Sequence, residues 1–261
     1  MEAKKETEAL YARLDDLLSR AERGEAAISQ FLSPKELYFA QIWLKRREAP
    51  FVSFGGYEDA ERCRVCVLPD YVDGEPSIEL LSEYGISLDI SVLKVKGSGF
   101  SKLSHRDFLG SLLGLGLDRS VVGDICVFED GKGAYVFCDT EITRFLTEEW
   151  KKAGNDKITV TKTVLQDGFS HKKRFLPVND TVASPRLDGI VAALCSLSRE
   201  KARSAVVAEL VELDYETETR PDRNISAPCL VSVRGYGKFR ILSVSDVTKK
   251  GRYRLVAEQY I

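Results

Sequence analysis

The sequence lacks a long hydrophobic run, an excess of one charge and the compositional bias of fibrous or disordered proteins. No stretch approaches the roughly 18 consecutive apolar residues of a membrane span, and residues 1–24 alternate charges with leucine, unlike a secretory signal. Lys and Arg number 38 against 40 Asp and Glu, which argues against a histone-like protein that coats nucleic acid. With only 8 Pro and 19 Gly in 261 residues, we expect a folded, monomeric, cytoplasmic protein without a membrane partner.

Histidine is almost absent, and this limits metal chemistry. The two histidines, His105 and His171, lie far from the Cys63-Arg-Val-Cys66 string, which has no second cysteine pair. In a strand, positions three apart face opposite sides, so both sulfurs would not reach one metal. We therefore predict no metal site and no cofactor, and free, reduced thiols at all six cysteines, which lie mainly in apolar runs.

The two ends of the chain differ in charge. Residues 168–261 hold 16 Lys and Arg against 11 Asp and Glu, whereas residues 1–167 hold 22 against 29. The basic C-terminal end is thus the candidate for an anionic partner.

The first 50 residues are predicted to form two helices. Apolar residues recur at helical spacing over residues 4–23, up to Gly24, and Ser33, Pro34 and Glu36 form a capping-box start for the second helix. The positions expected to be buried in that second helix are Leu37, Ala40, Ile42 and Leu44.

Shorter strands and two helices are predicted next, which is typical of a small α+β sandwich of one sheet and two helices. Ser104, with Asp107 three residues later, is the expected cap of the first of these helices, and the second spans residues 139–152. The expected strands are residues 62–68, 77–81, 86–95, 121–128, 134–138 and 158–165.

The C-terminal end is predicted to be a separate module after a linker at residues 168–182. Helices are expected at residues 186–196 and 198–210, and strands at residues 211–213, 229–233, 239–244 and 252–259. The predicted organisation is an N-terminal helical region (1–73), a middle domain (74–167), the linker and the basic module (183–261).

Four basic residues lie near the starts of the two helices of this module. Guanidinium groups and helix N-termini both suit phosphate oxygens, so these residues are candidates for RNA binding: Arg186, Arg199, Lys201 and Arg203. The Arg186-Leu-Asp string and Leu197-Ser-Arg-x-x-Ala202 make residues 183–235 resemble the alpha-L RNA-binding domain of the fourth small-subunit ribosomal protein. Turn positions depart from that pattern at Glu209, Asp214 and Ala227-Pro228.

Further strings make the whole chain resemble the YlmH family of bacterial ribosome-associated proteins. They are Phe54-Gly-Gly-Tyr-Glu-x-Ala-Glu-Arg62, Leu103-Ser-His-Arg-Asp-x-Leu-Gly-x-Leu-x-Gly-Leu-Gly-Leu117, Gly123-Asp-Ile-x-Val127 and Ser232-Val-Arg-Gly-Tyr-Gly-Lys-Phe239. The resemblance implies an RNA-recognition-like middle domain and a C-terminal alpha-L domain. It also implies a non-catalytic role on the large ribosomal subunit, with rRNA, tRNA and ribosomal proteins as partners, in quality control by tailing of stalled nascent chains.

Further basic residues extend the candidate surface of the module: Arg234, Lys238, Lys249 and Lys250. In the string from Arg234 to Phe239, Tyr236 or Phe239 either stacks on bases or packs within the protein. In the middle domain, His105 and Arg106 either hold the helix to the sheet or face RNA.

Two catalytic alternatives fit the residues poorly. His105-Arg106-Asp107 resembles the start of a kinase catalytic loop, but Leu112 stands where the metal-binding Asn belongs. Asp188 resembles the nucleophile of pseudouridine synthases, but Val191 and Ala193 replace the Thr and Gly of that string. We therefore predict no catalytic residue, and keep as alternatives an accessory to such an enzyme and an adaptor that docks on the ribosome through protein contacts.

Overall fold

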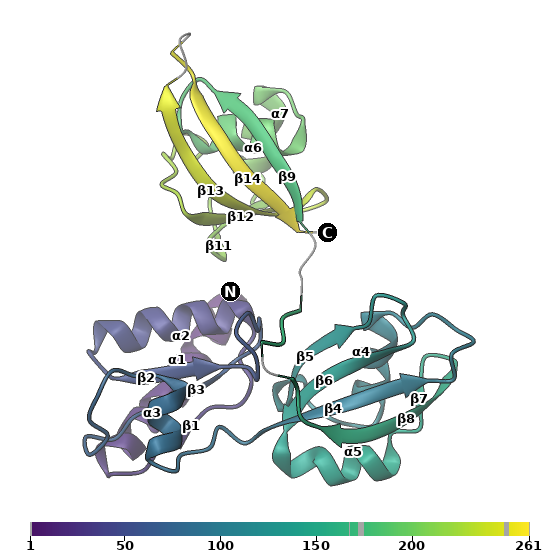
Figure 1. The fold of residues 1–261 in the computed structure, drawn as a ribbon. Helices are drawn as coiled ribbons and strands as arrows, with labels where there is room; N and C mark the ends of the chain where they lie inside the picture. Colours follow the sequence, from purple (N-terminus) through teal and green to yellow (C-terminus); the bar gives the residue numbers. More distant parts are fainter. Residues whose placement is uncertain (1, 167, 172–174, 248–250, 261) are drawn as a thin grey trace. The chain divides into compact units, whose positions relative to one another are not determined.

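The chain divides into two compact units, Met1–His171 and Lys172–Ile261, in which helices and strands are mixed (Figure 1). The computed structural model describes residues 2–166, 168–171, 175–247 and 251–260. The predicted α+β class is confirmed. No helix among the described residues is both long and apolar enough to cross a membrane.

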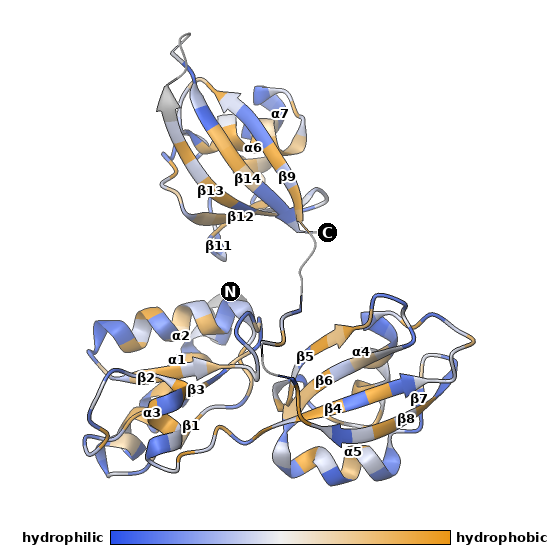
Figure 2. Cartoon of the chain, viewed as in Figure 1, coloured by the Kyte–Doolittle hydropathy of each residue, from blue (hydrophilic) through white to orange (hydrophobic). Residues whose placement is uncertain are grey.

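The N-terminal part of the first unit is a three-stranded sheet between helices. The strand order is β1 (Ala27–Ile28), β3 (Arg64–Val67) and β2 (Phe51–Phe54). Helices α1 (Glu2–Glu22) and α2 (Pro34–Arg46) pack on the Val65 and Val67 side of β3. The central strand β3 is buried on both faces, which explains why apolar residues run without a break from Val65 to Val67 after the buried Arg64 (Figure 2).

The predicted start of α2 is confirmed in detail. The Ser33 hydroxyl accepts a hydrogen bond from the Glu36 N–H, and the Glu36 carboxylate accepts one from the Ser33 N–H. Of the predicted core positions, Ala40 and Leu44 are buried, whereas Leu37 and Ile42 are only half-buried. Trp43 is the large side chain that fills the core instead, packed against Tyr11 of α1.

The strand predicted at residues 77–81 is wrong. These residues begin the helix α3 (Ile78–Glu83), which is capped by the Ser77 side chain. The reason is tertiary: Leu80 and Leu81 pack on the second face of the small sheet, in one cluster with Val52 and Cys66. A short apolar run alone does not distinguish a strand from a buried helix. The boundary expected at 73/74 therefore falls inside this hydrophobic cluster.

The remainder of the first unit is a five-stranded antiparallel sheet with helices on one face. Its elements follow the order β4 (Ile90–Gly97), α4 (His105–Gly114), η1 (Arg119–Val121), β5 (Val122–Val127), β6 (Gly133–Asp139), η2 (Thr140–Ile142), α5 (Thr143–Glu149), β7 (Lys152–Ala153) and β8 (Asp156–Thr163). The strand order is β5-β6-β4-β8-β7. Without the short β7, this is the β-α-β-β-α-β arrangement of an RNA-recognition domain, as predicted. Phe108 of α4 and Trp150 after α5 lie in the core on the helix side.

The second unit is a six-stranded sheet with two helices on one face. Its elements are β9 (Phe175–Val182), α6 (Leu187–Cys195), α7 (Arg199–Val207), β10 (Val211–Leu213), β11 (Glu216–Thr217), β12 (Cys229–Val233), β13 (Gly237–Val247) and β14 (Tyr253–Tyr260). The strand order is β11-β10-β12-β13-β14-β9. Leu187 and Val191 of α6 and Val206 of α7 pack on inward side chains of this sheet, such as Phe239 and Leu255.

The linker predicted at residues 168–182 is therefore wrong for its second half. Residues 175–182 form β9, which pairs with β14 from Phe175↔Tyr260 to Val182↔Tyr253. β9 has no alternating apolar pattern because it is an edge strand that places only Val182 fully in the core. Backbone pairing with β14 makes this segment a strand, and its side-chain pattern does not predict that pairing.

Candidate nucleic-acid interface

A buried carboxylate organises the start of the two helices in the second unit. Asp188 in the first turn of α6 is only 3% exposed. It accepts hydrogen bonds from Arg186 Nε and Nη2 at 3.2 and 3.0 Å and from Arg199 Nε and Nη2 at 3.2 and 3.3 Å. Each arginine makes a two-bonded pair with the same carboxylate, one from before α6 and one from the first residue of α7.

These bonds decide the charge state of the cluster. Burial raises the pKa of Asp188, but the hydrogen bonds from Arg186 and Arg199 outweigh it, so the pKa lies below its usual value. Asp188 also accepts the Gly189 N–H at 2.8 Å. The carboxylate therefore holds two guanidinium groups at the surface, where the side chains of Arg186 and Arg199 remain 37% and 56% exposed.

The other predicted residues of α7 continue this surface. Lys201 and Arg203 are exposed, and Arg203 follows Arg199 by four residues, on the same side of the helix. Ser198 caps the start of the helix, and its hydroxyl accepts the Lys201 N–H. Beside Arg199 lies a cavity of about 490 Å³ between β9 and α6, whose lining includes Thr181, Ala192 and Ser196.

The C-terminal basic residues do not join that cluster. Arg234 lies in the β12–β13 hairpin, and its N–H donates to the Leu210 carbonyl just after α7, at the opposite end of that helix from Arg199. Lys238 lies on the sheet face away from α6 and α7, since its neighbour Phe239 is in the core. Its ammonium is 4.9 Å from the ring centre of Tyr215. Lys249 and Lys250 lie outside the described residues.

The two stacking candidates separate clearly. Phe239 is 1% exposed and belongs to the hydrophobic core, so the interpretation that it stacks on bases is wrong. Tyr236 is 46% exposed in the hairpin turn.

One further pair of arginines in the second unit was missed by the sequence reasoning. Glu218 is a buried acid that binds Arg220 and Arg223. The available signal was an acid followed by arginines two and five residues later.

In the middle domain, the open face of the sheet is covered by the chain itself. Phe137 of β6 is fully buried, with the Tyr57 ring at 5.0 Å between centroids. Phe169 packs at 5.5 Å from Tyr57 and 5.4 Å from Tyr135. RNA-recognition domains stack bases on aromatics of this face. Here Tyr57 and Phe169 occupy the equivalent space.

Two of the strings that suggested the family meet beside this cover. Asp124 accepts hydrogen bonds from the Tyr57 hydroxyl at 2.8 Å and from the N–H groups of Glu61 and Arg62 at 2.7 and 3.1 Å. The Arg62 guanidinium donates to the carbonyls of Val122 at 3.0 Å, Phe31 at 3.1 Å and Arg119 at 3.0 Å. Burial and the Asp124 charge raise the pKa of Tyr57, which keeps its hydroxyl a donor. These strings join the two parts of the first unit.

The string from Leu103 to Leu117 forms the start of α4. Asp107 accepts the Ser104 N–H at 2.8 Å and the Ser104 hydroxyl at 2.7 Å, which confirms the predicted helix cap. His105 and Arg106 are exposed in the first turn. Partial desolvation of its ring and the nearby positive charge of Arg119 lower the pKa of His105.

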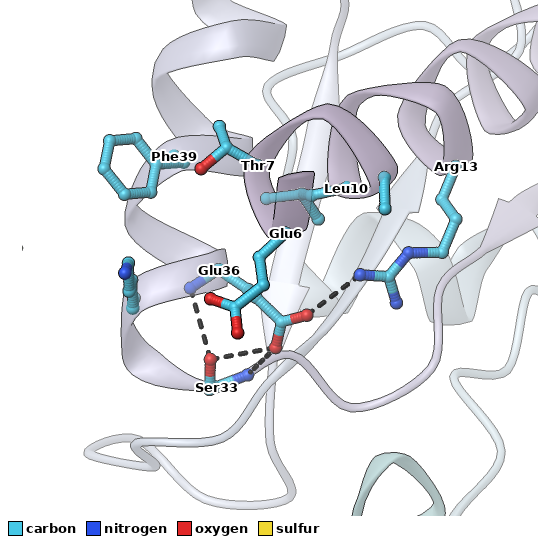
Figure 3. Close-up of a pocket in the computed structure, with 9 residues that line it drawn as sticks. Glu6, Thr7, Leu10, Arg13, Ser33, Glu36 and Phe39 are labelled. Carbon is cyan, nitrogen blue, oxygen red and sulfur yellow. Dashed lines mark hydrogen bonds and ion pairs between the residues drawn. The ribbon is translucent and has the colours of Figure 1, made fainter. Parts of the chain in front are cut away.

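A cavity of about 420 Å³ between α1 and α2 is lined by Glu6, Leu10, Arg13, Ser33, Glu36 and Phe39 (Figure 3). Its polar groups serve the fold, because Glu36 closes the capping box and pairs with Arg13 at 2.9 Å. Within the described ranges, no group of three or more His, Cys, Asp or Glu side chains could hold a metal ion.

Comparison with known proteins agrees with these features. Residues 6–72 match a family model for the N-terminal region of YlmH, and residues 86–167 match one for the putative RNA-binding domain in YlmH. Ribosome-associated protein quality control protein P2 of Bacillus subtilis (strain 168) is 27% identical over 238 residues, which cover 91% of this chain and 89% of that protein. The structure of cell division protein YlmH from Streptococcus pneumoniae is similar in fold, with a TM-score of 0.51 at 20% identity, covering 63% of this chain and 95% of that one. With both family models matched in order over more than half of its length, the chain belongs to the YlmH family.

Proposed function

We propose that this protein binds the rRNA and tRNA of the large ribosomal subunit without catalysing a reaction, and that it supports ribosome-associated quality control in the cytoplasm. The match to a putative RNA-binding domain and the relative named for quality control support the general role. Tailing of stalled nascent chains is the step in which we propose that it acts. The C-terminal unit is proposed to be an alpha-L domain.

The observation that carries the proposal is the pairing of Asp188 with Arg186 and Arg199. A guanidinium has five N–H donors in a fixed plane, and two of them are directed to the carboxylate in each arginine. The side chains are already ordered, so binding a phosphate requires little further loss of conformational entropy. Both oxygens of Asp188 accept hydrogen bonds from the two arginines, so we assign Asp188 to positioning them and not to catalysis.

The experiment is co-sedimentation of the full chain with separated bacterial ribosomal subunits across a salt series. If four to six phosphates are contacted, affinity for the large subunit should fall about 10²- to 10³-fold between 50 and 200 mM salt. The test variant is Lys201→Glu with Arg203→Glu, because both side chains are exposed on α7. Charge reversal at Arg186 and Arg199 is avoided, since it would place two new acids against the buried Asp188.

The matched control is Arg254→Glu. Arg254 is exposed on β14, and its neighbour Leu255 is in the core, so Arg254 faces away from α6 and α7. The proposal requires the α7 variant to lose binding and the control to keep it. Binding without salt dependence, or equal binding by both proteins, would contradict an RNA surface at these helices and favour docking through protein contacts.

A further inference from the structure

The loop after β11 repeats the design of the Asp188 cluster. Glu218 is 5% exposed, and its Oε1 accepts hydrogen bonds from Arg220 Nε at 3.0 Å and from the Arg220 N–H at 3.0 Å. Its Oε2 accepts Arg220 Nη2 at 3.2 Å and Arg223 Nη1. One buried carboxylate thus fixes two arginines, and their side chains stay 67% and 42% exposed.

The two clusters share one surface. The backbone of residues 221–225 runs antiparallel beside the start of α6, with the Asp188 N–H donating to the Pro221 carbonyl at 2.9 Å and the Leu187 N–H to the Arg223 carbonyl at 2.8 Å. Asp222 acts electrostatically on both Arg186 and Arg220, so both guanidinium groups lie near the same acid.

The charge of Glu218 does not prevent Arg220 and Arg223 from binding an anion. Glu218 stays ionised because the hydrogen bonds from Arg220 and Arg223 lower its pKa to about 2, although burial opposes this. Both of its oxygens already accept hydrogen bonds, whereas the side chains of Arg220 and Arg223 remain largely exposed to solvent. A fork held in this way suits the oxygens of a phosphodiester.

We infer that Arg220 and Arg223, positioned by Glu218, form a second phosphate-binding pair that extends the RNA surface from α6 and α7 onto the loop at residues 218–224. The ligand class is the RNA backbone, and the inference rests on the proposed function. Asp222 limits the affinity at the centre of this surface, because its charge repels phosphate.

The test compares the full chain with the triple variant Glu218→Gln, Arg220→Gln, Arg223→Gln. All three groups become neutral together, so no buried charge is left without a partner. Binding to isolated large ribosomal subunits is measured against salt concentration. Loss of two phosphate contacts should reduce the salt slope by roughly 1.4 to 1.8 and weaken binding roughly 20- to 60-fold at 0.1 M salt.

Two further variants distinguish phosphate binding by Arg220 and Arg223 from a purely structural role of this pair. Arg220→Lys with Arg223→Lys keeps the charge but loses the fork, and should recover part of the affinity with a near-normal slope. Asp222→Asn should tighten binding about two- to fivefold. Thermal unfolding of every variant shows which of them remain folded.

The outcomes are distinct. A folded triple variant with the slope and affinity of the natural chain would overturn the inference, while loss of binding by Lys201→Glu with Arg203→Glu would still support the proposed function. If the triple variant does not fold, Asp222→Asn decides: unchanged or weaker binding contradicts the inference. Absence of salt-sensitive binding by the natural chain would refute the proposed function itself.

Discussion

Asp124→Asn should destabilise the first unit strongly, because Asp124 joins its two parts. Oδ2 accepts from both the Tyr57 hydroxyl and the Glu61 N–H, and Oδ1 accepts from the Arg62 N–H. Asparagine has nearly the same shape but only one acceptor oxygen, so its amide must face at least one of these donors. A hydrogen bond to a charged group contributes about 1.5–3 kcal/mol. Losing one or two of them predicts a loss of about 2–5 kcal/mol.

The assay is thermal unfolding of the full chain followed by tryptophan fluorescence. Both tryptophans of the sequence, Trp43 and Trp150, lie in the first unit, so the signal reports on that unit. At about 2–4 °C per kcal/mol for a unit of this size, Tm should fall by roughly 5–15 °C. Asp59→Asn is the control, since Asp59 is exposed in the same segment as Tyr57. A shift no larger than that of the control would refute the role assigned to the junction.

Three further predictions follow from the same contacts. Gly56→Ala should destabilise the first unit, because its Cβ would lie 2.4 Å from Phe137 Cδ1 at a φ of +103°. Gly110→Ala, in the middle of α4 where a Cβ meets no other atom within 4 Å, should instead stabilise the unit by about 0.5–1 kcal/mol, and chemical denaturation measures both changes. Phe137→Leu should lower Tm by an amount equivalent to about 1 kcal/mol and leave the affinity for large subunits unchanged, and a selective loss of affinity would show that the covered sheet face binds RNA. The pKa of Glu218 is about 2 in the folded protein against 4.5 in the unfolded chain, so its contribution to stability is complete above pH 4.5 and is lost as the pH falls toward 2. In a denaturation series from pH 6 to 2, the free energy of unfolding of Glu218→Gln should therefore depend less steeply on pH than that of the natural chain, and an equal dependence would contradict this.

Local signals in the sequence predicted the parts of the fold that local chemistry decides. The capping boxes at Ser33 and Ser104 formed as expected, because each needs only residues three positions apart. Residues 77–81 and 175–182 were misassigned because a distant partner decides their structure: the second face of a small sheet in one case and β14 in the other. Neither partner leaves a periodic pattern in the segment itself.

The candidate surface was predictable only in part for a similar reason. Arg186 and Arg199 were found from their place near helix starts, and the structure brings them together on Asp188. Arg220 and Arg223 were missed because their use depends on a loop that folds back on α6. Lys238 was proposed from charge alone, whereas alternation along β13 places it on the face opposite to the helices.

Counting charges along the chain also gives a misleading view of the acids near the arginines. Asp188 and Glu218 each subtract from the basic surplus of residues 168–261, yet both are buried and each is bound by two arginines. Exposed guanidinium groups on a fixed carboxylate keep their outward donors in place, which a freely moving lysine does not. Asp222 differs from both acids because it is exposed and lies near Arg186 and Arg220. The expected gain of affinity in Asp222→Asn, set against the expected loss in the Glu218 triple variant, therefore tests whether burial of an acid decides its effect on RNA binding.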